Sequence, residues 1–238
     1  LNNSFDVFFS IGGDGTILRA ITYIRDLNIP ILGINTGRLG FLANIQKDSI
    51  EKSIDLLIAK KYKIQERTLL SIRTSPEISS ISELSFALNE ITIARENTTS
   101  MIGVKTFLNN EYLTNYWSDG LIIATPTGST GYSLSCNGPV ISPNSKNFII
   151  TPIAPHNFNA RPMVIPDDTR IQLEVESREK SFLISLDPRI TSVPKETKIY
   201  IEKSSFTIKS IIPSNQSFFS TLRTKLLWGE DTRNKSNI

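Results

Sequence analysis

Ile11-Gly12-Gly13-Asp14-Gly15-Thr16 is the stretch that decides the fold, because it joins a short apolar run to a segment with helical periodicity. The run Phe5–Ile11 is mostly apolar and predicts a buried strand. After the glycines, Ile17, Ile21 and Ile24 recur at helical spacing and predict a helix. A strand, a glycine turn and a helix N-terminus in this order predict a site for an anion.

The glycines of this turn suit a phosphate. Gly12, Gly13 and Gly15 can adopt positive φ and carry no Cβ, so their backbone N–H groups can close around phosphate oxygens. The helix that is predicted to begin near Thr16 adds free N–H donors and its dipole. No Gly-Lys-Ser/Thr follows, so the stretch is not a P-loop, and it lacks the G-x-G-x-x-G spacing of a dinucleotide fold.

Asp14 is unexpected in a phosphate site, because its carboxylate is repelled by the ligand. One interpretation is that Asp14 accepts a proton from a hydroxyl group that attacks a nearby phosphorus. The alternative is that Asp14 only caps the helix or its turn. The stretch itself leaves both open.

The 238 residues suffice for one large domain or two small ones. The formal net charge of +3 is too small to indicate nucleic-acid binding but suits an anionic ligand. Cys136 is the single cysteine, so we expect no intrachain disulfide and a reducing, cytoplasmic setting. No apolar run approaches the roughly 20 residues that span a bilayer, so no membrane partner is expected.

Residues 1–61 alternate strand and helix, which predicts a doubly wound α/β domain with parallel strands. The run Ile31–Ile34 predicts the second strand. Asp48, with Glu51 three residues later, predicts a capping box that opens an amphipathic helix ending near residue 60. Such folds usually carry a further strand and helix before this glycine turn, and Leu1 is not Met, so we expect an upstream βα unit to be missing.

Residues 62–212 predict an all-β domain of two packed sheets. Asn109-Asn110 predicts the tip of a hairpin. The predicted strands are alternating or β-branched runs: Leu69–Arg73, Leu88–Ile93, Gly103–Leu108, Leu121–Ala124, Ile171–Glu176, Phe182–Leu186, Lys198–Ile201 and Phe206–Ile211.

Residues 213–238 are predicted to return to the first domain. Phe218, Phe219, Leu222 and Leu226 form a stripe at helical spacing. An isolated helix of this length is marginal in water and needs a surface to dock on. The predicted fold is therefore an α/β domain (residues 1–61 and 213–238) plus a β-sandwich-like domain (residues 62–212).

Two stretches of the second domain indicate a ligand. In Asp119–Ser135 an apolar strand runs into hydroxyls, glycines and Tyr132, which suit a nucleoside with its phosphates; the alternative is a Ser/Thr-rich surface loop. Asn89-Glu90 lies in a strand-like run, so at least one of the two polar side chains points inward and needs a partner. That partner is either a ligand or a hydrogen bond at a domain interface.

Together these residues resemble the NAD kinase family. Gly12–Thr16 alone is weak evidence for this family, because diacylglycerol kinases and sphingosine kinases share the motif. Phosphofructokinases have a variant of it. Thr125–Thr130 followed by Tyr132–Ser135 is far more specific. The stretches that carry the resemblance are Ile11–Thr16, Asn35–Phe41, Asn89-Glu90, Asp119–Ser135, Pro152–His156 and Ser217–Gly229.

The resemblance implies an active site in the crevice between an α/β and a β-sandwich-like domain. It implies transfer of the ATP γ-phosphoryl group, with Mg²⁺ or another divalent cation, to the 2′-hydroxyl of the adenosine ribose of NAD. NADP is the product. It also implies a homodimer or homotetramer, in which Asp119 and Ala154 reach a neighbouring subunit's ligand.

By matched position, the resemblance makes Asp14 the proton acceptor. It assigns ATP phosphates to Gly12, Gly13, Gly15 and Thr16. It assigns the NAD site to Asp14, Gly15, Arg19, Asn89, Glu90, Asp119, Thr130, Gly131, Tyr132, Ser133, Leu134, Ser135 and Ala154.

Some positions depart from the family pattern. Gly131 replaces a common Ala, which we expect to be tolerated. Arg189 stands where Gln is frequent and Trp117 where a basic residue is frequent, so we carry over no family contact to these two positions. The alternatives to a NAD kinase are a lipid kinase of the diacylglycerol kinase type, a dinucleotide-binding sensor without catalysis, and a purely structural protein.

Overall fold

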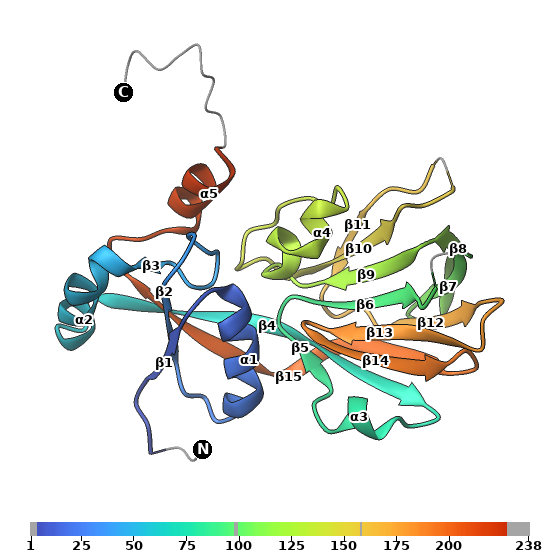
Figure 1. Cartoon of the computed structure of the whole chain (residues 1–238), viewed down its shortest axis with the longest axis horizontal. Helices are drawn as coiled ribbons and strands as arrows, with labels where there is room; N and C mark the ends of the chain where they lie inside the picture. Colours follow the sequence, from blue (N-terminus) through green and yellow to red (C-terminus); the bar gives the residue numbers. More distant parts are fainter. Residues whose placement is uncertain (1–3, 98–99, 158, 228–238) are drawn as a thin grey trace, which may run out of the picture. The chain divides into compact units, whose positions relative to one another are not determined.

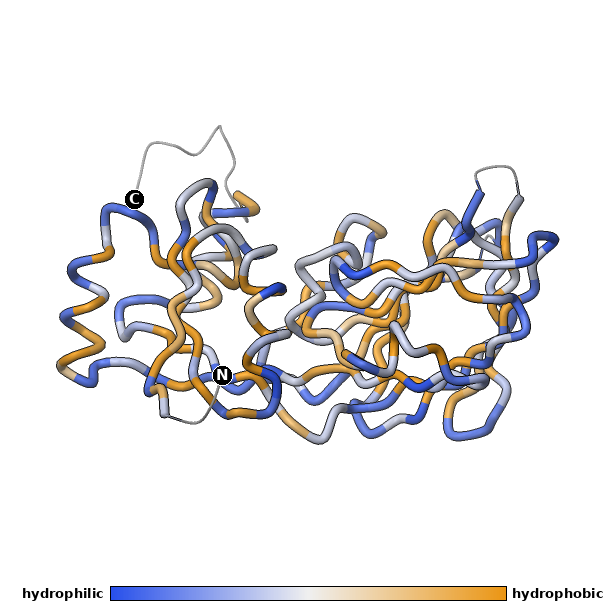
Figure 2. Tube along the Cα trace, turned by 60° about the horizontal axis from the view of Figure 1, so that its bottom comes forward, coloured by the Kyte–Doolittle hydropathy of each residue, from blue (hydrophilic) through white to orange (hydrophobic). Residues whose placement is uncertain are grey.

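The computed structural model describes residues 4–97, 100–157 and 159–227 (Figure 1). The chain divides into two compact units, which we call the first unit (residues 1–66 and 208–238) and the second unit (residues 67–207). Strands β4 (Tyr62–Ser75) and β15 (Lys198–Pro213) each run from one unit into the other. Figure 2 shows how apolar and hydrophilic segments alternate along the chain in both units.

The first unit is an α/β layer, as the alternation of strands and helices predicted. Strand β2 pairs in parallel with β1, β3 and the end of β15, and every residue of β2 is buried. Parallel strands that are covered on both faces read as continuous apolar runs, which explains the sequence of β2. The helices and strands that lie wholly in the first unit are β1 (Phe8–Ile11), α1 (Asp14–Ile24), β2 (Ile31–Asn35), β3 (Ile45–Gln46), a 3₁₀ turn (Lys47–Ser49), α2 (Ile50–Ile58) and α5 (Phe218–Leu226).

The start of α2 differs from the prediction. The residue that precedes the helix is Ser49, and no side chain caps it, so the capping box of Asp48 and Glu51 is wrong. The reason is the 3₁₀ turn over Lys47–Ser49, which places Asp48 inside a turn instead of in the extended conformation that a capping residue needs.

Helix α5 docks within the first unit through one aromatic side chain. Phe218 lies against Phe41, with 6.3 Å between ring centroids, and Ser217 and Ser220 form a reciprocal capping box. Only part of the predicted apolar stripe packs against the protein, because Phe219 is 62% exposed. The parts of the predictions that concern residues 228–238 lie outside the described residues.

The second unit consists of two packed β-sheets, as predicted. One contains β4, β5 (Phe86–Ala87), β7 (Ile102–Leu108), β8 (Glu111–Ser118), β12 (Ile171–Glu176) and β15. The other has the order β11 (Met163–Pro166), β10 (Asn147–Ile153), β9 (Gly120–Ala124), β6 (Glu90–Arg95), β13 (Ser181–Leu186) and β14 (Arg189–Pro194). Short helices α3 (Ser79–Ser82) and α4 (Tyr132–Ser135) and a 3₁₀ turn (Gly128–Thr130) complete the unit.

The core of the second unit is shared by the two sheets. Val104 and Leu173 from one sheet and Ile91, Phe148 and Phe182 from the other belong to one buried apolar cluster. Alternating burial along β12 and β13 shows that each of these strands turns one face to this core.

The predicted hairpin tip is confirmed, since Asn109 and Asn110 join β7 to β8 with φ of 51° and 68°. Two predicted strands, Lys198–Ile201 and Phe206–Ile211, are wrong as separate elements, because β15 is one strand of 16 residues. The residues between them are partly polar, but they continue the strand from one unit into the next.

Candidate active site

The glycine turn between β1 and α1 is held by one glycine and left open by two others. Gly12 has φ of +148°, and a Cβ there would lie 2.3 Å from Oγ1 of Thr16. Its N–H donates to the carbonyl of Ile34 at 2.9 Å. Gly12 is thus the one glycine of the turn with positive φ, whereas Gly13 has φ of −92° and a Cβ at Gly13 or Gly15 would meet no heavy atom within 4 Å. The space for a ligand lies beside Gly13 and Gly15.

Asp14 does not cap its helix. The residue preceding α1 is Gly13, and no side chain caps the helix, so the capping interpretation is wrong. The Asp14 carboxylate instead accepts three backbone N–H groups, from Phe41 on Oδ2 at 2.8 Å and from Leu42 and Ala43 on Oδ1 at 3.1 and 2.9 Å. Charged acceptors make the stronger hydrogen bonds, so Asp14 fixes this segment of chain at the helix N-terminus.

The segment that Asp14 binds, which we call the 36–43 loop, is held from its other side by Asn35. Asn35 is buried; its Oδ1 accepts the N–H of Gly37 at 2.7 Å, and its Nδ2 donates to the carbonyl of Arg38 at 2.8 Å. A Cβ on Gly40 would lie 1.9 Å from Oδ1 of Asp14, so the loop approaches the carboxylate more closely than another residue at that position permits.

Lys225 of α5 lies beside the same carboxylate. Its Nζ is 3.9 Å from Oδ2 of Asp14 and 4.7 Å from the centroid of the Phe41 ring. The ammonium group therefore contacts both the carboxylate and the loop that the carboxylate binds.

In the second unit Asp187 has the same role for the turn that contains Asn89 and Glu90. Its carboxylate accepts the N–H groups of Leu88, Asn89 and Glu90 at 2.8, 2.8 and 3.2 Å. Asp187 has φ of 52° in the tight turn between β13 and β14. Burial raises the pKa of this carboxyl group, while the three N–H donors oppose the rise.

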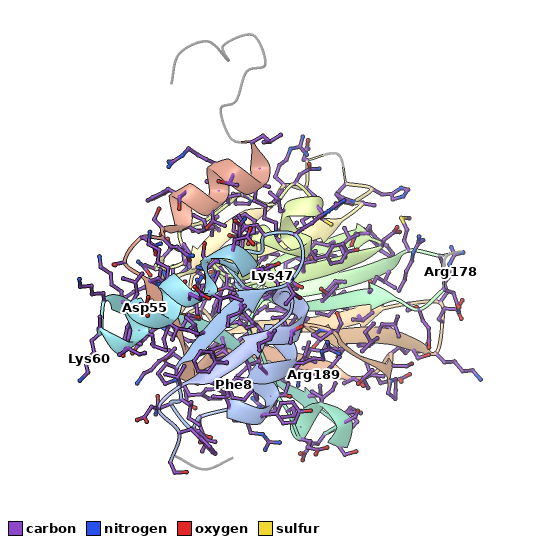
Figure 3. The ribbon with its side chains drawn as sticks, turned by 60° about the vertical axis from the view of Figure 1, so that its left-hand side comes forward. Phe8, Lys47, Asp55, Lys60, Arg178 and Arg189 are labelled. Carbon is purple, nitrogen blue, oxygen red and sulfur yellow. The ribbon has the colours of Figure 1, made fainter. Side chains whose placement is uncertain are left out.

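Arg189 is the first residue of β14, directly after this turn (labelled in Figure 3). Its guanidinium donates to the carbonyls of Leu84, at 2.6 Å, and of Phe86, and lies over the Phe86 ring. These contacts tie β14 to β5 and explain the residue without a ligand.

Asn89 and Glu90 each present a buried oxygen that lacks a partner. Within the described residues, neither Oδ1 of Asn89 nor Oε2 of Glu90 makes a hydrogen bond. Burial and the charge of Asp187 raise the pKa of Glu90 to about 7, and the backbone N–H of Tyr132 opposes the shift. Unpartnered buried oxygens are rare in folded proteins, and here two of them lie on adjacent residues.

The stretch from residue 125 to residue 135 is not a surface loop. The side chains of Thr125, Ser129 and Ser133 are buried, and their hydroxyls bond within the protein. Thr125 donates to the carbonyl of Leu88 at 2.6 Å, and Ser133 bonds to Thr151 at 2.9 Å. These three hydroxyls therefore shape the segment, whereas the more exposed Tyr132 and Ser135 remain accessible to a ligand.

Two glycines bring this segment against the Asn89–Glu90 turn. A Cβ on Gly128 would lie 2.0 Å from the carbonyl oxygen of Asn89, so a larger residue cannot fit. A Cβ on Gly131 would lie 2.9 Å from Oε2 of Glu90, so this chain has more room beside that carboxyl group than a chain with Ala there. The structure thus joins Asn89, Glu90 and the segment around Tyr132 into one cluster.

The remaining predicted residues are dispersed over the two units. Arg19 is exposed on α1, and Ala154 is exposed with φ of 43°. Asp119 pairs with Arg95 at 2.9 Å, at a pocket that Trp117 also lines. Thr130 and Leu134 are partly buried beside Tyr132.

Sequence reasoning missed Asp187 and Lys225 as site residues. Only Arg189 was singled out in this stretch, because the N–H groups that Asp187 binds are nearly a hundred positions away. Nothing in the sequence around Lys225 distinguishes it from the neighbouring Arg223.

An α/β unit with an open glycine turn at a helix N-terminus suits a phosphorylated ligand, and the comparisons with known proteins give the class, a phosphotransferase. Two family models match the chain: the ATP-NAD kinase N-terminal domain over residues 1–62 and the ATP-NAD kinase C-terminal domain over residues 88–213. The chain belongs to the NAD kinase family and is a kinase.

Curated relatives and solved structures agree with this assignment. The NAD kinases of Flavobacterium psychrophilum and Christiangramia forsetii are 56% and 57% identical over 234 residues, which is 98% of this chain and 80% of each relative. An NAD kinase from Archaeoglobus fulgidus in complex with ATP has a TM-score of 0.80 at 32% identity, covering 94% of this chain and 84% of that one. Yeast NADH kinase complexed with NADH shares the fold, with a TM-score of 0.85 at 24% identity over 96% of this chain and 69% of that one. These matches do not favour a lipid kinase or a structural protein.

Proposed function

We propose that this kinase transfers the γ-phosphoryl group of ATP to the 2′-hydroxyl of the adenosine ribose of NAD, giving NADP. The observation that carries the proposal is Asp14, an ionisable side chain at the N-terminus of α1 beside the open glycine turn. Membership of the NAD kinase family supports the choice of substrates.

Asp14 is proposed as the proton acceptor. A ribose hydroxyl is a poor nucleophile at neutral pH, and a carboxylate within hydrogen-bond reach takes its proton as the O–P bond forms. The two oxygens of a carboxylate offer about four acceptor sites, and three of those on Asp14 are used by the 36–43 loop. The remaining acceptor site is available to the substrate hydroxyl.

The phosphates of ATP are proposed to lie at the glycine turn. Gly13 and Gly15 leave space there, and the N-terminus of α1 supplies a positive dipole end. Thr16 is proposed to contact the phosphates as well, although its own N–H already donates to the carbonyl of Gly13 at 2.9 Å. The N–H of Gly12 already donates to the carbonyl of Ile34. Gly12 is therefore proposed to shape the turn through its positive φ. Most of the rate enhancement comes from alignment of the reactants and stabilisation of phosphoryl charge.

The dinucleotide is proposed to bind the cluster in the second unit. Asn89 and Glu90 accept donors from its adenosine portion, because their buried oxygens lack partners among the described residues. The ring of Tyr132 offers a flat surface for a base. The further contacts proposed are Gly15, Arg19, Asp119, Thr130, Gly131, Ser133, Leu134, Ser135 and Ala154.

A divalent cation, Mg²⁺ by preference, is proposed to arrive with ATP. Among the described residues no group of three or more His, Cys, Asp or Glu side chains is placed to hold a metal ion. This fits a cation bound through substrate phosphates, where it neutralises the charge that develops on the transferred group.

We also propose a cytoplasmic homodimer or homotetramer, with NAD and ATP as small-molecule partners and neither nucleic acid nor membrane as a partner. The exposed Ala154 and the partly exposed Asp119 support contact with a neighbouring subunit. None of the helices in the described ranges is long and apolar enough to cross a membrane.

One experiment tests the function. The purified protein is incubated with ATP, Mg²⁺ and NAD, and NADP is measured with an NADP-specific dehydrogenase. We expect NADP to accumulate only when ATP is present. Tight binding of NAD without NADP formation would instead favour the non-catalytic sensor.

A further inference from the structure

A carboxylate at a phosphate site poses an electrostatic problem within the first unit. Asp14 stands at the N-terminus of α1, where we place the triphosphate, and like charges repel. Its three hydrogen bonds come from backbone amides, which carry no net charge. The carboxylate therefore repels the phosphates, and a cation close to it would offset part of that repulsion.

Lys225 supplies that cation from the far end of the sequence. Its Nζ lies 3.9 Å from Oδ2, the oxygen that also accepts the N–H of Phe41. The ammonium group is held over the Phe41 ring at 4.7 Å from the centroid, a geometry that is itself attractive. One residue, Phe41, thus binds Asp14 through its backbone and Lys225 through its ring.

The position of Lys225 is set by the docking of α5. Phe218 packs against Phe41 at the start of the helix, and Ser217 and Ser220 cap that end. The last turn of α5 carries two cations, Arg223 and Lys225, and in the described residues only Lys225 has an ion pair with Asp14. Arg223 is therefore a natural control for Lys225, because it is a cation in the same turn of α5 but, in the described part of the chain, is not paired with Asp14.

We propose that Lys225 is a positioning residue for the kinase reaction, whose ammonium group offsets the charge of Asp14 so that the phosphates of ATP can approach it. This rests on the proposed function, in which the phosphates bind at the glycine turn. Lys225 acts on the substrate through Asp14 and does not itself bind the phosphates.

The test is a double-mutant cycle read by calorimetric titration of Mg²⁺ and ATP. We compare the wild type, Lys225→Met, Asp14→Asn and the double variant. Removing a cation about 4 Å from a partly exposed carboxylate is expected to weaken ATP binding about fivefold. In the Asp14→Asn background the same removal is expected to change it less than about twofold, because the charge to be offset is gone.

Two controls separate this role from a structural one. Lys225→Arg keeps the charge and is expected to restore ATP binding, whereas Arg223→Met removes the neighbouring cation and is expected to leave it unchanged. In steady-state assays Lys225→Met is expected to raise KM for ATP and leave KM for NAD unchanged. A thermal melt checks that each variant is folded.

Equal weakening by Lys225→Met in both backgrounds would overturn the proposal, since it would show that the lysine contacts the phosphates itself. Unchanged ATP binding in both would overturn it too. Failure of the proposed function is a separate result: the wild type would form no NADP whatever Lys225 does.

Discussion

Asp187 accepts the backbone N–H of Asn89 at 2.8 Å, and so a carboxylate from a distant turn fixes one of the residues proposed to bind the dinucleotide. The N–H groups on either side, of Leu88 and Glu90, bind the same carboxylate. Asp14 holds the 36–43 loop of the first unit in the same way. Each unit thus contains one aspartate whose carboxylate binds three consecutive backbone amides.

Asp187→Ala is expected to destabilise the second unit by about 3 kcal/mol, because three amides lose a charged acceptor. Thermal melting measures the loss, and hydrogen exchange at residues 88–90 shows where it occurs. Asp168→Ala, at an exposed position, is the control and should melt like the wild type. Unchanged exchange at residues 88–90 would contradict the role given to Asp187.

Asp14→Asn is expected to lower kcat by about 10² or more while NAD affinity stays within about threefold, because a neutral amide cannot accept the hydroxyl proton. Steady-state kinetics and titration of NAD measure the two effects. Asp26→Asn removes an exposed carboxylate just beyond α1 and serves as the control. A kcat near that of the wild type would exclude Asp14 as the base.

Tyr132→Ala is expected to raise KM for NAD more than KM for ATP, because the ring is proposed to contact a base of the dinucleotide. The side chain is 46% exposed, so stability should change by no more than about 0.5 kcal/mol. Tyr23→Ala, which removes an exposed ring on α1, controls for the loss of an aromatic surface. Equal changes in both KM values would argue against this contact.

Gly12→Ala and Gly13→Ala are expected to separate folding from phosphate binding. At Gly12 the φ of +148° and the contact with Thr16 make any side chain strained, with an expected loss of about 1–3 kcal/mol in stability. At Gly13 a methyl group meets no atom within 4 Å, so the variant should melt like the wild type but show a higher KM for ATP. A normal KM for ATP in Gly13→Ala would place the phosphates elsewhere.

The stability of the chain is expected to fall between pH 5 and pH 7 because of Glu90. Burial and Asp187 raise its pKa from 4.5 to about 7 in the folded protein. In this window the folded state keeps the proton that the unfolded state releases, so stability decreases as pH rises through it and levels off above pH 7. This pKa shift changes the free energy of unfolding by at most about 3 kcal/mol. Urea unfolding at several pH values measures the slope, which should be flatter for Glu90→Gln.

Local chemistry let the sequence predict much of the architecture. The glycine turn, the helix after it and the hairpin at Asn109-Asn110 follow from periodicity and from residues that accept positive φ. Asn89 and Glu90 stood out because two adjacent polar residues interrupt an apolar run, and both prove to have a buried oxygen without a partner among the described residues. In each case the signal lies within a few neighbouring residues.

What the sequence did not predict depends on contacts between distant segments. The hydroxyls of Thr125 and Ser129 resembled ligand-binding groups, but whether a hydroxyl turns inward is decided by carbonyls elsewhere in the chain. The length of β15 escaped prediction for the same reason, since this strand pairs with β12, β2 and β4, which come from distant parts of the chain. Lys225 matters through its distance from Asp14, which no local pattern encodes.

The first unit takes its strands and helices from both halves of the chain, since β2 pairs with the end of β15 and α5 docks on the 36–43 loop. On the ribosome, β1, α1 and β2 are made early and must wait for residues 208–227 before the layer closes. The second unit, which is one continuous segment, is complete before then. Residues 208–227 therefore complete the first unit only after the whole of the second unit has been made, so the unit whose strands are made first is the later of the two to close.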